Sequence, residues 1–131
     1  MAVLVDSSVW IAAAKPSNTE CFSLKKLIQN NEQIYITGPI QVEVCQGARS
    51  KEEFHKLWEA FLGFDFLEIT DRIWGLSAWN YFLCKKKGMG ISTIDCLIAT
   101  LAKEYRIPLW SIDKDFKKVQ PTIGFELHPI K

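Results

Sequence analysis

The sequence predicts an α/β fold in which a mostly parallel sheet carries helices on both faces. Short segments that are continuously apolar and rich in β-branched residues alternate with longer segments of amphipathic helical pattern. Strands that are apolar throughout are typical of parallel sheets, because these sheets are buried on both faces. No internal repeat, linker or low-complexity tract interrupts this alternation.

The elements follow in order from these patterns. Four strands are expected at residues 2–5, 33–37, 64–69 and 108–112, with a fifth at 124–128. Helices are expected at 7–14, 21–29, 51–62, 70–88 and 92–105, with another opening at 37–39 and a short helical turn at 113–118. Pro39 suits the first turn of its helix. Gly88 is expected to stop the long helix, whose last turn carries Lys85, Lys86 and Lys87.

The composition indicates one domain over residues 1–131. Apolar residues make up 48% of the chain and charged residues 24%, which suits one continuous core. No stretch reaches the roughly 18 apolar residues that span a bilayer, and the N-terminus lacks a secretory pattern, so a cytoplasmic location is expected. Cys21, Cys45, Cys84 and Cys96 form no C-x-x-C pair and are expected to be buried free thiols. The net charge of +1 argues against nucleic-acid binding through bulk positive charge.

Four acidic residues occur among predicted core segments. Asp6 and Asp113 directly follow strands, Glu43 lies one turn inside a helix, and Asp95 lies in the first turn of another. In a parallel sheet, ligands bind outside the carboxyl ends of the strands, where these residues are expected to gather.

A structural explanation exists for three of the four. Asp6 and Asp113 could cap the helices that follow them, and Ser92-x-x-Asp95 matches a capping box. Helix N-termini gather at one edge of a parallel sheet, so capping acids cluster there without any function. Glu43 is the exception, since it lies too far inside its helix to satisfy the free N–H groups.

Clustered carboxylates are ligands suited to Mg²⁺ or Mn²⁺, which take an octahedral oxygen shell of carboxylates, waters and a substrate phosphate. Such ions can orient and acidify an attacking water and stabilise the leaving oxygen of a phosphodiester. The acids therefore indicate phosphodiester cleavage.

The segments around the acids resemble the four motifs of PIN-domain ribonucleases, and in particular the bacterial VapC-type toxins of toxin–antitoxin pairs. These segments are V-D-S-S-V-W-I at 5–11, Q-V-E-V-C-Q-G at 41–47, S-T-I-D-C-L-I-A at 92–99 and W-S-I-D-K-D-F at 110–116. The resemblance runs from residue 2 to about residue 128 in the same order and spacing. The combination is specific although each motif alone is weak.

The resemblance implies a three-layer α/β/α fold with Mg²⁺- or Mn²⁺-dependent endonucleolytic cleavage of RNA. It also implies a homodimer and inhibition by a cognate antitoxin. Carried over position by position, the catalytic and metal-binding acids are Asp6, Glu43, Asp95 and Asp113, with Asp115 beside them as a further ligand. Ser7 or Ser8, together with Thr93, take the places of small hydroxyl residues that support the acids or approach the phosphate.

Other residues carry weaker hypotheses. The run Lys85 to Lys87 either complements the helix dipole or contacts RNA phosphates. His55 and His128 have no triad partner or metal-ligand spacing. Most of the five tryptophans are expected on core faces, while Trp58 and Phe54 are candidates for a groove that receives an antitoxin helix.

Three alternative functions remain open on sequence alone. The first is a housekeeping RNA-processing nuclease with the same fold and metal but no inhibitor. The second is a phosphoacceptor signalling domain, which would require an acidic pair after the first strand where this chain has Ser7 and Ser8. The third is a binding module whose acids are structural.

Overall fold

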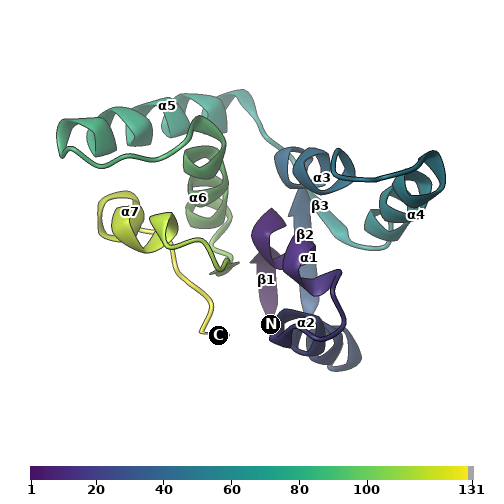
Figure 1. Ribbon diagram of the computed structural model, residues 1–131. Helices are drawn as coiled ribbons and strands as arrows, with labels where there is room; N and C mark the ends of the chain where they lie inside the picture. The colour runs from purple at the N-terminus through teal and green to yellow at the C-terminus, as the bar shows by residue number, and fades with distance from the viewer. Residues whose placement is uncertain (130–131) are drawn as a thin grey trace.

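The computed structural model describes residues 1–129, so the last two residues of the domain expected over 1–131 lie outside the described part (Figure 1). The strands are β1 (Ala2–Val5), β2 (Gln33–Thr37), β3 (Asp65–Leu67) and β4 (Leu109–Trp110). The helices are α1 (Ser7–Ala13), α2 (Thr19–Gln29), α3 (Gly38–Cys45), α4 (Lys51–Phe61), α5 (Asp71–Lys86), α6 (Thr93–Tyr105) and α7 (Asp115–Ile123).

The four strands form one sheet in the order β3-β2-β1-β4, and every pairing is parallel. Leu4 is central, since it pairs with Tyr35 on β2 and with Leu109 on β4. The predicted α/β class with a parallel sheet is therefore confirmed. Because all strands run the same way, their carboxyl ends share one edge of the sheet.

The fifth strand expected at 124–128 is wrong in extent. Only Leu127 bridges to Leu109, supported by a hydrogen bond from the His128 N–H to the Leu109 carbonyl of 2.8 Å. The bridge stays isolated because β4 itself has only two residues with which to pair. The short turn expected at 113–118 is instead the nine-residue α7, which buries Phe116, Val119 and Ile123 at helical spacing.

Apolar side chains pack on both faces of the sheet, as the continuous apolar strands predict. Val3 and Val5 of β1 pack with Leu24 and Leu27 of α2, whereas Leu4 joins the larger cluster that includes α3, α6 and α7. In Figure 1, α5, α6 and α7 gather on one side of β1, away from α3 and α4. The sheet thus separates two apolar layers.

A buried polar contact ties α5 to α6. The Asn80 amide donates to Thr100 Oγ1 over 3.0 Å, and that hydroxyl donates to the Cys96 carbonyl over 2.8 Å. The helix α5 ends as expected, with Gly88 in a left-handed conformation (φ 71°) one residue beyond its cap. We call this contact between α5 and α6 the Asn80–Thr100 seam, and it holds α5 against the helix that carries Asp95.

The prediction that most tryptophans lie on core faces is wrong. Trp110 is fully buried and Trp10 is half-buried, but Trp58, Trp74 and Trp79 are exposed. Trp58 lies on α4, and Trp74 and Trp79 lie on α5.

Cys45, Cys84 and Cys96 are buried free thiols as expected, while Cys21 is only half-buried. Within residues 1–129, no helix has both the length and the apolar character required to cross a bilayer.

Candidate active site

Asp6 is the most buried acid of the candidate site, with a side chain 3% exposed at the carboxyl end of β1. Its Oδ2 accepts hydrogen bonds from Ser8 Oγ (2.6 Å), from Ser111 Oγ (2.8 Å) and, more weakly, from the Ser8 N–H (3.4 Å). Its Oδ1 is also buried but accepts no hydrogen bond from any described residue. Asp6 therefore caps α1 with one oxygen and leaves the other without a partner.

Glu43 reaches the same edge of the sheet from α3, the helix that follows β2. Gly38 is the first residue of α3, so Glu43 lies beyond the turn whose N–H groups need a cap. Its Oε1 accepts a hydrogen bond from Ser7 Oγ over 3.3 Å. Burial raises the pKa of Glu43 and the nearby charge of Asp6 raises it further, while the Ser7 hydrogen bond lowers it. Asp6 and Glu43 therefore face each other.

Asp95 lies in the first turn of α6, where its backbone N–H donates to Ser92 Oγ over 3.0 Å. The expected Ser92 cap is present. Burial raises the pKa of the Asp95 carboxyl to about 6. The hydrogen bond to Ser92 opposes this rise, while the charges of Asp6, Asp113 and Glu43 add to it. All four predicted acids thus interact electrostatically at one place.

Asp113 and Asp115 stand where the chain passes from β4 into α7. Oxygen atoms of Asp95, Asp113 and Asp115 all lie within 4.8 Å of one another. Asp113 is not the cap residue of α7, which is Lys114; instead its Oδ1 accepts the N–H of Asp115 over 2.9 Å. Asp115 is also paired with Lys118 over 3.4 Å. Asp115 is therefore partly neutralised within its own helix.

The three hydroxyl residues predicted to support the acids, Ser7, Ser8 and Thr93, differ in what they contact. Ser7 and Ser8, which the sequence left as alternatives, both contact an acid: Ser7 contacts Glu43 and Ser8 contacts Asp6. Thr93 lines a separate hollow with Trp74 and Tyr81 and makes no hydrogen bond to an acid among the described residues.

Ser111 is a site residue that sequence reasoning missed. It donates to Asp6 Oδ2 and accepts the Asp113 N–H over 3.0 Å, so it links the first and fourth motifs. The sequence feature that could have identified Ser111 is its position directly after the last strand, which places it at the same sheet edge as Asp6.

The residues present fit a divalent cation. The potential ligands are carboxylate oxygens, which suit a hard ion such as Mg²⁺ or Mn²⁺. A buried carboxylate oxygen without a hydrogen bond is costly, and a cation would satisfy Asp6 Oδ1. Burial is the main reason that the pKa of Asp95 and that of Glu43 are raised, and the neighbouring acids add to both shifts, which a bound cation would oppose.

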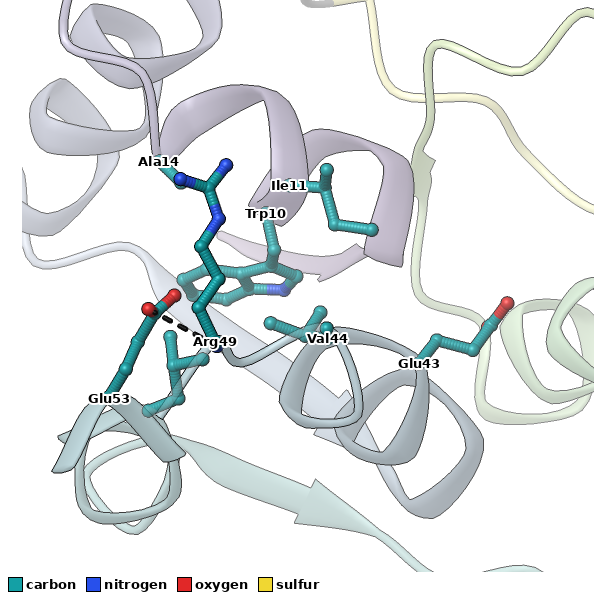
Figure 2. Close-up of a pocket in the computed structure, with 9 residues that line it drawn as sticks. Trp10, Ile11, Ala14, Glu43, Val44, Arg49 and Glu53 are labelled. Atoms are coloured by element: carbon teal, nitrogen blue, oxygen red, sulfur yellow. Dashed lines mark hydrogen bonds between the residues drawn. The ribbon is translucent and has the colours of Figure 1, made fainter. Parts of the chain in front are cut away.

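A groove of about 430 Å³ begins beside Glu43 and runs between α1, α3 and α4. Figure 2 shows Trp10 at its floor and Arg49 reaching across it toward Ala14, while the Glu43 carboxylate points away at the other end. The α4 residues that line it are Glu53 and Leu57. Phe54 and Trp58, which were expected to form such a groove, instead stack on each other outside it with ring centroids 6.2 Å apart.

Together, the fold and the site define a parallel α/β protein with an acidic cluster that could bind a metal ion at the carboxyl edge of its sheet. The family model described as PIN domain matches residues 3–120. The chain therefore belongs to the PIN-domain family, which is a family of nucleases.

Solved structures share this fold at low sequence identity. VapBC2 from Rickettsia felis, solved bound to a promoter DNA fragment, is 19% identical with a TM-score of 0.80 over 98% of both chains. VapBC-1 from nontypeable Haemophilus influenzae is 15% identical with a TM-score of 0.79, over 98% of this chain and 97% of the other. The sarcin–ricin loop cleaving toxin VapC20 from Mycobacterium tuberculosis is 15% identical with a TM-score of 0.70, over 94% and 95%. No curated protein matches the chain in sequence.

Proposed function

We propose that this chain is a divalent-metal-dependent endoribonuclease and the toxin of a type II toxin–antitoxin pair. The observation that carries the proposal is the buried Asp6 Oδ1, which accepts no hydrogen bond from residues 1–129, on an acid whose charge raises the pKa of both Glu43 and Asp95. The capping role of Asp6 accounts for Oδ2 alone and leaves Oδ1 unexplained, because buried polar groups are normally paired.

In this proposal Asp6, Glu43, Asp95 and Asp113 hold Mg²⁺ or Mn²⁺, with Asp115 as a further ligand. When bound, such an ion supplies an acidified water and neutralises charge on the phosphate. Ser8 and Ser111 hold Asp6 Oδ2, which fixes the direction in which Oδ1 points. Ser7 orients Glu43 in the same way. The RNA substrate is supported by the motif resemblance and by the structural similarity to VapC20, a toxin that cleaves the sarcin–ricin loop.

An antitoxin partner is supported by the similar structures, several of which are toxin–antitoxin complexes. The groove between α1, α3 and α4 is the surface that suits a peptide helix, because Trp10, Val44 and Leu57 give it an apolar lining. Arg49 and Glu53 at its rim add charges that a partner could pair. An occupant of this groove that continued past Glu43 would obstruct access to the acids.

A homodimer requires a second apolar surface, and α5 offers one. Trp79 and Phe82 are exposed and stack with ring centroids 5.4 Å apart, and Trp74 is exposed on the same helix. Exposed apolar patches of this kind mark association surfaces. We place self-association there, in a cytoplasmic protein that works without a membrane.

The decisive test changes Glu43, because Glu43 has no capping role. Glu43→Gln should abolish Mg²⁺-dependent cleavage of single-stranded RNA and reduce the thermal stabilisation that Mg²⁺ gives the wild type. Glu59→Gln makes the same chemical change at an exposed residue of α4 and should behave as wild type. Equal cleavage by wild type and Glu43→Gln would show that the activity comes from a contaminant or from another site.

The toxin role is tested separately from the chemistry. Induction of this chain alone should arrest growth, and co-expression of a short adjacent reading frame should relieve the arrest. Active protein that is harmless on overexpression would instead favour the housekeeping nuclease.

A further inference from the structure

A second groove, of about 460 Å³, starts at the candidate active site and runs along the N-terminal end of α7. We call it the α7 groove, and it is lined by Ser111, Ile112, Asp113, Lys114, Lys117 and Leu127, together with His128 and Pro129. Ser111 and Asp113 belong to the acidic site as well. The α7 groove is therefore continuous with the place where a scissile phosphate would lie.

The charge of the α7 groove differs from that of the acidic site. Lys114 and Lys117 are exposed, and neither forms an ion pair with any residue in 1–129. Lys118, the next residue, differs because it is held by Asp115. In a chain with a net charge of only +1, two unpaired lysines beside the acids are a local feature. They suit an anion that extends away from the acidic site.

The α7 groove also has an apolar lining. Ile112 lines it and is 48% exposed although it directly precedes Asp113, and Leu127 lines it and is half-buried. An apolar wall beside two lysines matches one nucleotide of a single strand, because its base has an apolar face and its phosphate is anionic. A protein segment would need acidic side chains at the matching positions to pair with the lysines, whereas every nucleotide of a strand carries a phosphate.

We propose that the α7 groove binds the nucleotide adjacent to the scissile phosphate of a single-stranded RNA. Its phosphate lies against Lys114 and Lys117, and its base lies against Ile112 and Leu127. This inference rests on the proposed ribonuclease function. It implies that the RNA strand leaves the acidic site along α7 on one side of the scissile phosphate.

The charge half of the inference is tested with Lys114→Gln/Lys117→Gln. The readout is fluorescence anisotropy of a short labelled single-stranded RNA over a range of salt concentrations. Each phosphate contact that is lost lowers the slope of log affinity against log salt by about 0.7 for a single strand, and both lysines contact the same phosphate, so the double variant should lose about 0.7. KM for cleavage should rise several-fold with kcat unchanged. Lys25→Gln/Lys26→Gln removes the same charge from exposed positions of α2 and should match wild type.

The apolar half is tested with RNAs that carry one abasic nucleotide at each position flanking the cut. Wild type should bind one of these RNAs several-fold more weakly than the intact strand, and Ile112→Ala should lose that discrimination. A salt slope and KM equal to wild type in the lysine variant, or no abasic position that matters, would overturn the α7 groove as a nucleotide site. Failure of wild type to cleave any RNA with Mg²⁺ or Mn²⁺ would instead overturn the ribonuclease proposal. The two failures can be told apart because the anisotropy measurement reports RNA binding and does not depend on cleavage.

Discussion

Ser111 Oγ donates a hydrogen bond of 2.8 Å to Asp6 Oδ2, although 105 positions separate the two residues in the chain. The pairing of β1 with β4 brings them together, because Val5 lies beside Trp110 in the parallel register and each site residue comes directly after. Ser8 Oγ donates to the same oxygen over 2.6 Å and lies 3.2 Å from Ser111 Oγ. The two hydroxyls therefore restrict the rotation of the Asp6 carboxylate and keep Oδ1 directed away from them.

Ser111→Ala should weaken metal binding more than it weakens the fold. Hydrogen-bond partners of metal ligands typically account for about 10- to 100-fold in affinity, so the Mg²⁺ concentration for half-maximal cleavage should rise by about tenfold or more. The measurement is a Mg²⁺ titration of cleavage rate, with the thermal shift at each concentration as a second readout.

Ser50→Ala is the matched control, because Ser50 caps α4 away from the acids by accepting the Glu53 N–H. It should lose about 1 kcal/mol of folding free energy with no change in the Mg²⁺ titration. If Ser111→Ala gave the same pattern as this control, Ser111 would be only a structural link between strand ends.

The raised pKa of Asp95 predicts a pH-dependent stability in the absence of metal. Its pKa is about 6 in the folded chain against an ordinary 3.8, so between these values the folded state holds more protons than the unfolded state. Stability contributed by this group is therefore present at low pH, falls as pH rises from about 4 to about 6, and stays low above that. Asp95→Asn should flatten this part of the profile and raise the melting temperature at pH 7.

The difference in melting temperature between Asp95→Asn and wild type should reverse its sign when metal is added. Mg²⁺ binds the ionised carboxylate of wild type and stabilises it by linkage, whereas the asparagine variant should gain less and lose cleavage. Melting curves at pH 5 and pH 7, with EDTA and with Mg²⁺, give the four values needed. A variant less stable than wild type in EDTA at pH 7 would contradict the electrostatic origin of the shift.

Asp113 and Asp115 should differ in importance. Both lie near Asp95, but the charge of Asp113 is the one that raises the pKa of Asp95, and Asp115 is engaged by Lys118. Asp113→Asn should therefore reduce metal affinity more than Asp115→Asn does. Asparagine keeps the oxygen that accepts the Asp115 N–H, so the turn before α7 should survive the change. Calorimetric titration with Mn²⁺ ranks the two, and a larger loss in Asp115→Asn would exchange their roles.

The sequence predicted the first half of the fold closely because its strands are marked by continuous apolar runs. The strands at 2–5 and 33–37 have the expected bounds, whereas those expected at 64–69 and 108–112 contain only Asp65–Leu67 and Leu109–Trp110. Apolar character marks burial, but strand length also depends on how many residues a neighbour can pair. The isolated bridge at Leu127 has the same cause.

The candidate site was predictable where it depends on topology. Parallel strands place Asp6 and Asp113 at one edge, and helices that start there bring Glu43 and Asp95 to the same place. Sequence spacing could not show the contact between Ser111 and Asp6, which depends on strand register. Nor could it show that Trp74 and Trp79 are exposed, because an exposed apolar face and a core face carry the same apolar pattern.

The Asn80–Thr100 pair should behave as a coupled structural unit behind the site. Thr100→Val keeps the shape of the side chain but leaves the buried Asn80 amide without its acceptor, which should cost about 1–3 kcal/mol. Adding Asn80→Leu removes the unpaired amide as well, so the double variant should recover part of that loss. Urea denaturation of both single variants and the double variant gives the coupling energy.

This cycle also separates stability from positioning. Thr100 bonds to the Cys96 carbonyl, one residue after Asp95, so the seam could hold the acid as well as the fold. If the seam only stabilises the fold, cleavage per folded molecule should be unchanged in the double variant, and the Mg²⁺ titration should match wild type. A shifted Mg²⁺ titration in a fully folded double variant would mean that the α5–α6 contact sets the position of Asp95, because within residues 1–129 no side-chain hydrogen bond joins Asp6, Glu43 or Asp113 to Asn80 or Thr100.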